Sequence, residues 1–147
     1  MQIREINVDE VSEAVASLCI KANTELGDDV VAAFRSAGTR EESSIGREIL
    51  KLTVENARIA KEKRLPICQD TGLAVVFMDV GRNVHFSGGE LAEAVDRGVS
   101  DGYSRAQLRA SSLDAVTREN TADNTPAVLH VRIEIGRASC RERVCHR

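Results

Sequence analysis

The stretch that decides the fold of this chain reads Pro66-Ile67-Cys68-Gln69-Asp70-Thr71-Gly72. Proline fixes its own φ and pushes the residue before it out of the helical region, and glycine permits a sharp or left-handed turn. Between them, a short and stiff loop carries a thiol, a carboxamide, a carboxylate and a hydroxyl. The apolar run 73–78 follows and predicts a buried strand. A polar loop fixed by the strand behind it is a common place for chemistry.

Composition narrows the class of protein. The chain has 147 residues, 42% of them hydrophobic and 29% charged, which is enough for one domain with a core. A formal net charge of -3 and an aromatic content of 3% argue against nucleic-acid binding. No apolar stretch approaches the roughly 20 residues of a membrane helix, and the first residues lack a signal-peptide core. We therefore expect a cytoplasmic protein whose cysteines are not a disulfide framework.

The first predicted helix follows Asn7, an N-cap residue whose capping box is completed by Glu10. Apolar residues recur after it at helical spacing and form one stripe. These residues are Val8, Val11, Val15, Leu18 and Ala22. Cys19 lies at the edge of the stripe, where we expect it to be a small buried hydrophobe.

Two further helices are predicted before the polar loop. A short helix over 30–37 is capped by Asp28 or Asp29 and ended by Gly38. Ser43 or Ser44 then opens the longest helix, which Pro66 terminates. One face of this helix carries Ile45, Ile49, Leu52 and Ile59.

After the loop the pattern changes to strands. Residues 73–80 and 84–86 flank a turn signal at 81–83 and predict a β-hairpin. A helix over 90–102 follows, in which Gly98 and Gly102 indicate close packing or fraying. A dense turn cluster spans 120–126, and alternation over 131–135 predicts a half-exposed strand. The fold class is therefore α+β, with N-terminal helices packed on a mixed or antiparallel sheet, as an incomplete domain.

The residues alone leave the chemistry of Cys68 open between a nucleophile, a metal ligand and a buried thiol. A cysteine nucleophile needs a base, and His85 and His130 are available, so a thiol-dependent hydrolase remains an alternative. The spacing of Cys140 and Cys145 is weak for zinc. A non-catalytic helical interaction module is the other alternative.

Two motifs take the interpretation further. Residues 66–72, followed by an apolar strand, resemble the signature of the iron-sulfur hydro-lyases of the class I fumarase and L(+)-tartrate dehydratase family. Residues 120–130 resemble the second signature of that family, in which glycine is usual at the position of Ala122. Residues 18–23 and the segment ending in Gly88-Gly89 also fit, so the resemblance covers about residues 3–135. The chain resembles the start of the α subunit or the N-terminal part of a single-chain enzyme.

The resemblance implies a reversible hydration of a small dicarboxylate, fumarate to malate or tartrate to oxaloacetate, and does not choose between them. It makes Cys68 one ligand of a [4Fe-4S] cluster whose other cysteine ligands lie further along the family chain. The cluster acts as a Lewis acid on the departing hydroxide. Gln69 and Asp70 then contact the substrate, with Asp70 in the acid-base machinery, and Arg109 pairs with a substrate carboxylate.

The end of the chain departs from the family pattern. After Ile135 the sequence becomes basic, and residues 134–145 resemble a translated sequencing adapter. We therefore divide the chain into residues 1–135, a fragment of the catalytic domain, and residues 136–147, a non-native and unpatterned tail. We expect this fragment to be inactive, because one thiolate does not hold a four-iron cluster. Its expected partners are a β subunit or the C-terminal half of the enzyme, in a homo- or hetero-oligomer.

Overall fold

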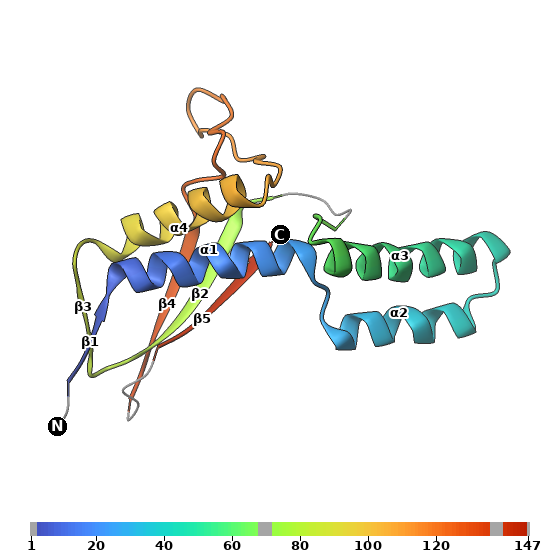
Figure 1. Cartoon of the computed structure of the whole chain (residues 1–147), viewed down its shortest axis with the longest axis horizontal. Helices are drawn as coiled ribbons and strands as arrows, with labels where there is room; N and C mark the ends of the chain where they lie inside the picture. Colours follow the sequence, from blue (N-terminus) through green and yellow to red (C-terminus); the bar gives the residue numbers. More distant parts are fainter. Residues whose placement is uncertain (1–2, 68–71, 136–139, 147) are drawn as a thin grey trace. The chain divides into compact units, whose positions relative to one another are not determined.

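The computed structural model describes residues 3–67 and 72–135, and the backbone of residues 140–146. Their elements (Figure 1) are, in chain order, β1 (Arg4–Asn7), α1 (Val8–Thr24), α2 (Asp28–Arg40), α3 (Ser44–Lys63), β2 (Ala74–Gly81), β3 (Val84–Ser87), α4 (Leu91–Arg105), β4 (Val128–Glu134) and β5 (Cys140–His146). They form two compact units, one of residues 1–20 with 70–147 and one of residues 21–69. None of the helices in the described ranges is long and apolar enough to cross a membrane.

The first unit is built on a three-stranded mixed sheet in the order β4-β2-β5. β4 runs parallel to β2, with Val75 opposite Val128, and β5 runs antiparallel, with Ala74 opposite His146. Helices with a mixed sheet confirm the predicted α+β class. The backbone of 140–146 forms a strand where composition predicted an unpatterned tail. An antiparallel strand there pairs the backbone groups along the second edge of β2, which accounts for the difference.

The predicted β-hairpin is wrong. β2 and β3 follow one another closely but belong to different sheets, because β3 pairs in parallel with β1. Ile6 lies opposite Phe86 in this second sheet, and the N–H of Arg4 donates to the carbonyl of Asn83 at 2.9 Å. The turn after β2 therefore connects the three-stranded sheet to the two-stranded sheet of β1 and β3. Its sequence resembles that of a hairpin turn because a turn within one sheet and a turn between two sheets require the same turn-forming residues.

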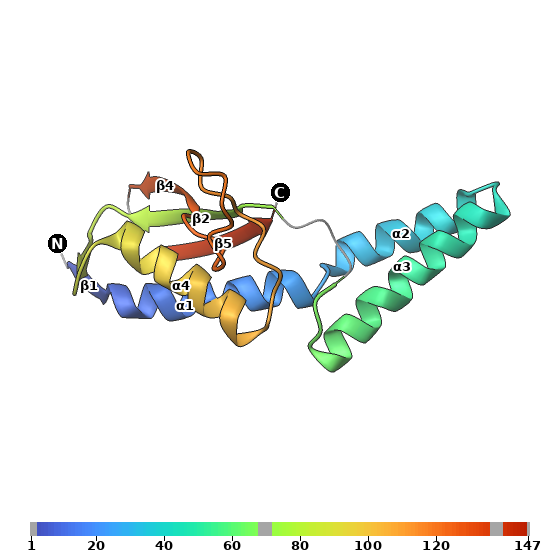
Figure 2. The same ribbon diagram turned by 90° about the horizontal axis from the view of Figure 1, so that it is seen from above.

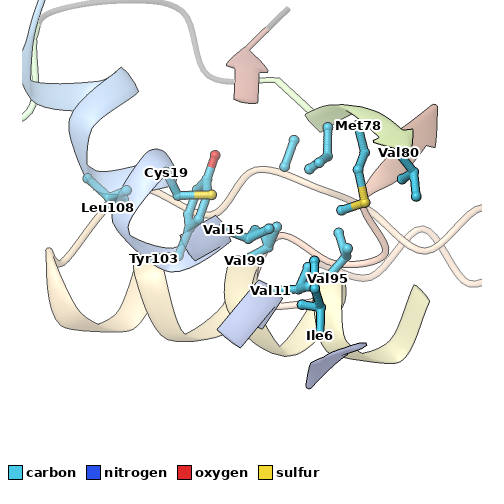
Figure 3. Close-up of a cluster of buried hydrophobic side chains, with 12 residues drawn as sticks. Ile6, Val11, Val15, Cys19, Met78, Val80, Val95, Val99, Tyr103 and Leu108 are labelled. Atoms are coloured by element: carbon cyan, nitrogen blue, oxygen red, sulfur yellow. The ribbon is translucent and has the colours of Figure 1, made fainter. Parts of the chain in front are cut away.

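Helices α1 and α4 cover one face of the three-stranded sheet (Figure 2). Alternate residues of β2 point into the core, and the two helices supply valines from their inner faces. Cys19, Tyr103 and Leu108 lie at one end of this cluster (Figure 3). The buried side chains common to the sheet and the two helices are Val11, Val15, Cys19, Ala74, Val76, Met78, Val80, Val95, Val99 and Tyr103.

Helix α1 begins as the sequence predicts. The side chain of Asn7 accepts a hydrogen bond from the N–H of Asp9 at 2.8 Å, and the carboxylate of Glu10 accepts one from the N–H of Asn7 at 3.4 Å. The stripe residues Val8, Val11 and Val15 are almost fully buried. The N-cap and the period of the stripe together were enough to predict this helix.

Gly98 and Gly102 allow α1 and α4 to approach closely. A Cβ added at Gly98 would lie 2.4 Å from the carbonyl oxygen of Ser12, and one added at Gly102 would lie 2.8 Å from that of Ala16. Close packing is therefore the reason for these glycines, and α4 continues through both to Arg105. The seam has no room for any side chain at these two positions.

The second unit contains the helical hairpin of α2 and α3. Helix α2 continues through Gly38, which does not end it as predicted, because this glycine faces α3. A Cβ built on Gly38 would lie 4.0 Å from that of Leu50, an ordinary contact distance. Helix α3 begins as predicted, since the side chain of Ser43 accepts from the N–H of Gly46 at 3.2 Å. It ends at Arg64, which adopts the left-handed conformation just before Pro66.

Candidate functional site

Three of the predicted site residues, Cys68, Gln69 and Asp70, lie outside the described residues. The chain on either side of them is well anchored. Ile67 is buried, and its N–H donates to the carbonyl of Asn23 at 2.8 Å. After the loop, the carbonyl of Gly72 accepts a hydrogen bond from the side chain of Asn124 at 3.1 Å. Each flanking residue is therefore held within its own unit, Ile67 in residues 21–69 and Gly72 in the other unit.

Arg109 is exposed, on the segment that follows α4. The residue before it, Leu108, is buried in the core and donates its N–H to the carbonyl of Tyr103 at 2.9 Å. The carbonyl of Ala110 accepts from the side chain of Asn120 at 3.1 Å. Arg109 thus lies on a short backbone segment that is held by hydrogen bonds on both sides.

Asn124 joins the two sequence motifs. Its side chain is fully buried, and its Oδ1 accepts hydrogen bonds from the N–H of Ser111 at 2.9 Å and from the N–H and hydroxyl of Ser112 at 3.0 and 2.9 Å. Its Nδ2 donates to the carbonyl of Gly72. One carboxamide therefore connects the second motif, the end of the first motif and the segment that carries Arg109.

The backbone of the second motif is shaped by its own polar side chains. The Oδ1 atom of Asn120 accepts from the N–H of Ala122 at 2.7 Å, and the Oδ1 atom of Asp123 accepts from the N–H and hydroxyl of Thr125 at 3.0 and 2.8 Å. Ala122 has a φ of 66° and Asn124 a φ of 63°, and the Thr125–Pro126 bond is cis. Glycine adopts such a φ freely, which explains physically why glycine suits the position of Ala122.

The electrostatics beside this motif are acidic. Burial opposes ionisation of Asp123, but hydrogen bonds from Thr125 and Thr121 outweigh it and lower the pKa of this carboxyl. Asp96 of α4 accepts from the N–H of Ala127 at 2.8 Å and fixes the start of β4. Asp123 also lines a shallow polar hollow of about 380 Å³ with residues of α4, among them Glu93, Asp96, Arg97 and Asp101. A dicarboxylate is not suited to this hollow, because carboxylates predominate in its lining.

Among the described side chains, the remaining thiol and imidazole groups do not form a second site. Cys19 is fully buried, as predicted, and burial raises its pKa to about 12, so its thiol stays protonated and unreactive. His130 stacks on Phe77 with ring centroids 5.0 Å apart, and His85 lies on β3. Within residues 3–67 and 72–135 no group of three or more His, Cys, Asp or Glu side chains is arranged to hold a metal. The described residues thus do not by themselves hold an iron-sulfur cluster.

Sequence reasoning missed the central position of Asn124. It treated residues 120–126 as a turn cluster and as a signature, without separating the exposed side chains from the buried one. A pattern of turn-forming residues gives no indication of burial, and the partners of Asn124 lie 12, 13 and 52 residues away. The nearest available signal was the density of polar side chains before a proline, which predicts side-chain-to-backbone hydrogen bonds but not their partners.

Known proteins resemble this chain over most of its length. The family model described as fumarate hydratase (Fumerase) matches residues 12–144. The putative L(+)-tartrate dehydratase subunit alpha of Methanocaldococcus jannaschii is 34% identical over 116 residues, which are 78% of this chain and 41% of that protein. The L(+)-tartrate dehydratase subunit alpha of Escherichia coli K12 is 30% identical over 118 residues, or 80% of this chain and 39% of that protein. The chain thus spans about two fifths of the length of these relatives, and it belongs to the fumarate hydratase (Fumerase) family.

Proposed function

We propose that this chain is the N-terminal part of the catalytic α subunit of an iron-sulfur hydro-lyase that adds water to, or removes it from, a small dicarboxylate. The family match over residues 12–144 carries the proposal. The hydrogen bonds of Asn124 support it, because they connect Gly72, the last residue of the first motif, with the second motif and with the segment that carries Arg109. An interaction module has no need to hold these three segments together.

The roles of the site residues follow from this proposal. Cys68 supplies one thiolate ligand to a [4Fe-4S] cluster. Gln69 and Asp70 contact the substrate, and Asp70 handles a proton at the carbon next to the departing hydroxyl. Arg109 pairs with a substrate carboxylate through its two-pronged donor geometry. Its exposure leaves the guanidinium open to a ligand.

The same proposal limits what the chain does alone. One thiolate does not hold a four-iron cluster, so we assign the other ligands to the part of the relatives' length that this chain does not span. The relatives are named as α subunits, and we propose a β subunit, or an equivalent C-terminal half, as the partner. We propose the cytoplasm as its location, and we retain residues 136–147 as a non-native tail.

The test is a chimaera in which residues 1–135 of this chain are continued with the remaining sequence of the Methanocaldococcus jannaschii relative, co-expressed with a β subunit. After anaerobic reconstitution with iron and sulfide, we expect the visible absorbance of a cluster and hydration activity on fumarate or dehydration activity on tartrate. Cys68→Ala should abolish the absorbance, whereas Cys19→Ala should retain it, because Cys19 is buried in the core. A colourless and inactive chimaera, or a Cys68→Ala variant that keeps its cluster, contradicts the proposal.

A second variant tests the role of Arg109. Arg109→Lys keeps the positive charge but loses the bidentate geometry, so KM for the dicarboxylate should rise about tenfold or more. Arg118→Lys is the matched control, because Arg118 is an exposed arginine of the neighbouring loop outside both motifs. Equal KM values for the two variants would remove Arg109 from the substrate site.

A further inference from the structure

Strand β4 has an apolar row of side chains on one face and a mostly polar row on the other. Residues that lie opposite each other on neighbouring strands point to the same face of the sheet, so the register with β2 identifies the two rows. The row that shares a face with the buried residues Val76, Met78 and Val80 of β2 consists of Leu129, Val131 and Ile133. This inner face is the one that α1 and α4 cover.

The outer row of β4 is adapted to an open surface. The ring of His130 stacks on Phe77, with the ring centroids 5.0 Å apart. The guanidinium of Arg132 lies 3.2 Å from the carboxylate of Asp79 and 2.9 Å from that of Glu134. Polar and charged groups of this kind are compatible with water. The outer row therefore does not call for a cover.

The inner row is apolar but largely uncovered. Val131 is 46% exposed and Ile133 60%, whereas their register partners Met78 and Val80 are 1% and 3% exposed. Leu129, at the start of β4, still packs against the core. The layer of α1 and α4 therefore covers β2 and the start of β4, but does not extend over the end of β4.

The end of β4 is also open along its edge. Among the strands that the structure describes, β2 is the one that pairs with β4, so the other edge of β4 carries unpaired backbone groups. Ile135, which follows the strand, continues the alternation of the inner row and is 81% exposed. A β-branched apolar row beside an unpaired edge is a surface that proteins normally cover.

The size of the row indicates what kind of segment covers it. A stable interface between separate proteins takes about 20–30 residues from each side, and this row offers Val131, Ile133 and Ile135. A segment of the same polypeptide needs far fewer contacts, because its tether already holds it close to the row. The relatives extend well beyond the two fifths of their length that this chain spans, so the proposed parent has such a segment.

We propose that Val131, Ile133 and Ile135 form the docking face for an amphipathic helix from the part of the α subunit that follows residue 135. A helix fits this face because α1 and α4 already form a helix layer on it, and elements on one face of a sheet pack as one layer. The inference rests on the proposed function in one respect, since it assumes that the parent chain continues as its relatives do.

The first experiment measures how accessible the two faces of β4 are to a thiol-alkylating reagent. Ile133→Cys and Arg132→Cys place a thiol on the inner and the outer face, and both positions are exposed in the 147-residue chain, so both variants should react quickly there. In the α subunit of the chimaera described above, Ile133→Cys should react at least about tenfold more slowly, and Arg132→Cys should keep its rate. Peptide mass spectrometry separates these sites from the other cysteines.

Equal rates for both variants in a chimaera that circular dichroism shows to be folded would overturn the proposal. So would protection of position 133 that requires the β subunit or disappears on dilution, because a separate chain would then be the cover. Protection in a colourless and inactive chimaera would support the docking face and contradict the proposed function. Cluster formation and activity without protection would do the reverse.

A second variant tests the same face without a reagent. Ile133→Thr keeps the β-branched shape that suits a strand but places a hydroxyl in the apolar row. It should lower the thermal unfolding midpoint of the chimaera and leave that of the 147-residue chain unchanged, because residue 133 is exposed there. Val128→Thr, on the outer face of the same strand, is the matched control and should leave both midpoints unchanged. An Ile133→Thr chimaera as stable as its parent would show that nothing docks on this row.

Discussion

The two helix pairs of this molecule, α1–α4 and α2–α3, are built in opposite ways. In the first pair, Gly98 and Gly102 bring the helix backbones close together, and both helices bury valines against the sheet. In the second pair, no residue of α2 is buried and α3 buries only Ala57 and Ala60. Three larger apolar side chains of α3, those of Ile45, Ile49 and Leu52, are exposed. All four helices are amphipathic in sequence. An apolar stripe thus predicts that a helix forms, but it does not predict what covers the stripe.

The largest expected effect tests this difference with the same substitution in both pairs. Gly98→Ala places a methyl group 2.4 Å from the Ser12 carbonyl oxygen, which is backbone and cannot rotate away. We expect a loss of about 3 kcal/mol in the free energy of unfolding, at the upper end for overpacking. Gly38→Ala meets Leu50 only at 4.0 Å and removes a glycine from a helix interior, so it should gain about 0.5–1 kcal/mol. Urea denaturation of both variants measures these two changes in the free energy of unfolding.

The most informative result is the sign of the change in the free energy of unfolding of Gly38→Ala. If Gly38→Ala destabilises the chain as much as Gly98→Ala does, the α2–α3 hairpin is packed as closely as α1–α4, and the contrast between the two pairs is lost. A neutral Gly98→Ala would mean that the seam between α1 and α4 opens at little cost.

A smaller loss of stability is expected in the loops of the first unit, where one asparagine, Asn124, is buried and another, Asn120, is exposed. Asn124→Ala removes the acceptor of the Ser111 and Ser112 N–H groups and the donor to the Gly72 carbonyl. Ser112 is buried, whereas Ser111 and Gly72 are half-exposed and regain water, so we expect a loss of about 2 kcal/mol. Asn120→Ala, which removes two hydrogen bonds of an exposed side chain, should cost about 1 kcal/mol or less.

Hydrogen exchange locates this effect within the chain. Asn124→Ala should increase exchange at the Ser112 N–H and in the following loop, and leave the amides of α2 and α3 unchanged, because all partners of Asn124 lie in the first unit. Faster exchange throughout α3 would show that the two units unfold together and that the division between them has no energetic meaning.

These contrasts show which parts of the fold could be predicted from the sequence. It predicted α1 with its capping box, the start of α3 at Ser43 or Ser44, the strand after the polar loop and the α+β class, because caps and hydrophobic period are local signals. It wrongly predicted the hairpin of β2 and β3, since a tight turn does not reveal whether the next strand stays in the same sheet. The role of Gly38 was missed for a similar reason, because a helical glycine is explained by its partner helix and not by its neighbours in sequence.

The candidate site was predicted only as a set of motifs. The role of Arg109 stays a prediction; its neighbours Ala110 and Ser111 are fixed by Asn120 and Asn124 from a distant segment. No property of residues 107–109 indicates these partners. The assignments of Cys68, Gln69 and Asp70 stay predictions, because these residues lie outside the described part of the chain.

The smallest expected effect compares one carboxylate from each unit. Hydrogen bonds from Arg58 lower the pKa of Glu55, in spite of some desolvation, and the positive charge of Arg58 adds to them. Neutral hydroxyl and amide donors lower the pKa of Asp123, against the opposing effect of burial. Both groups therefore stabilise the fold above about pH 4, and this contribution is lost as the pH falls through their lowered pKa values.

High salt should distinguish a pKa lowered by a charged partner, as at Glu55, from one lowered by neutral hydrogen-bond donors, as at Asp123. At about 1 M salt the Debye length is about 3 Å, so the exposed Arg58–Glu55 pair is screened and the pKa of Glu55 should rise toward its ordinary value. The pKa of Asp123 should change less, because its donors carry no charge and are fixed by the loop. NMR titration of the side-chain carboxyl carbons at low and high salt measures both in one sample. Equal salt responses would mean that Asp123 depends on a nearby charge and not on the loop, and that the first unit is no more rigidly organised around its polar groups than the exposed surface of α3.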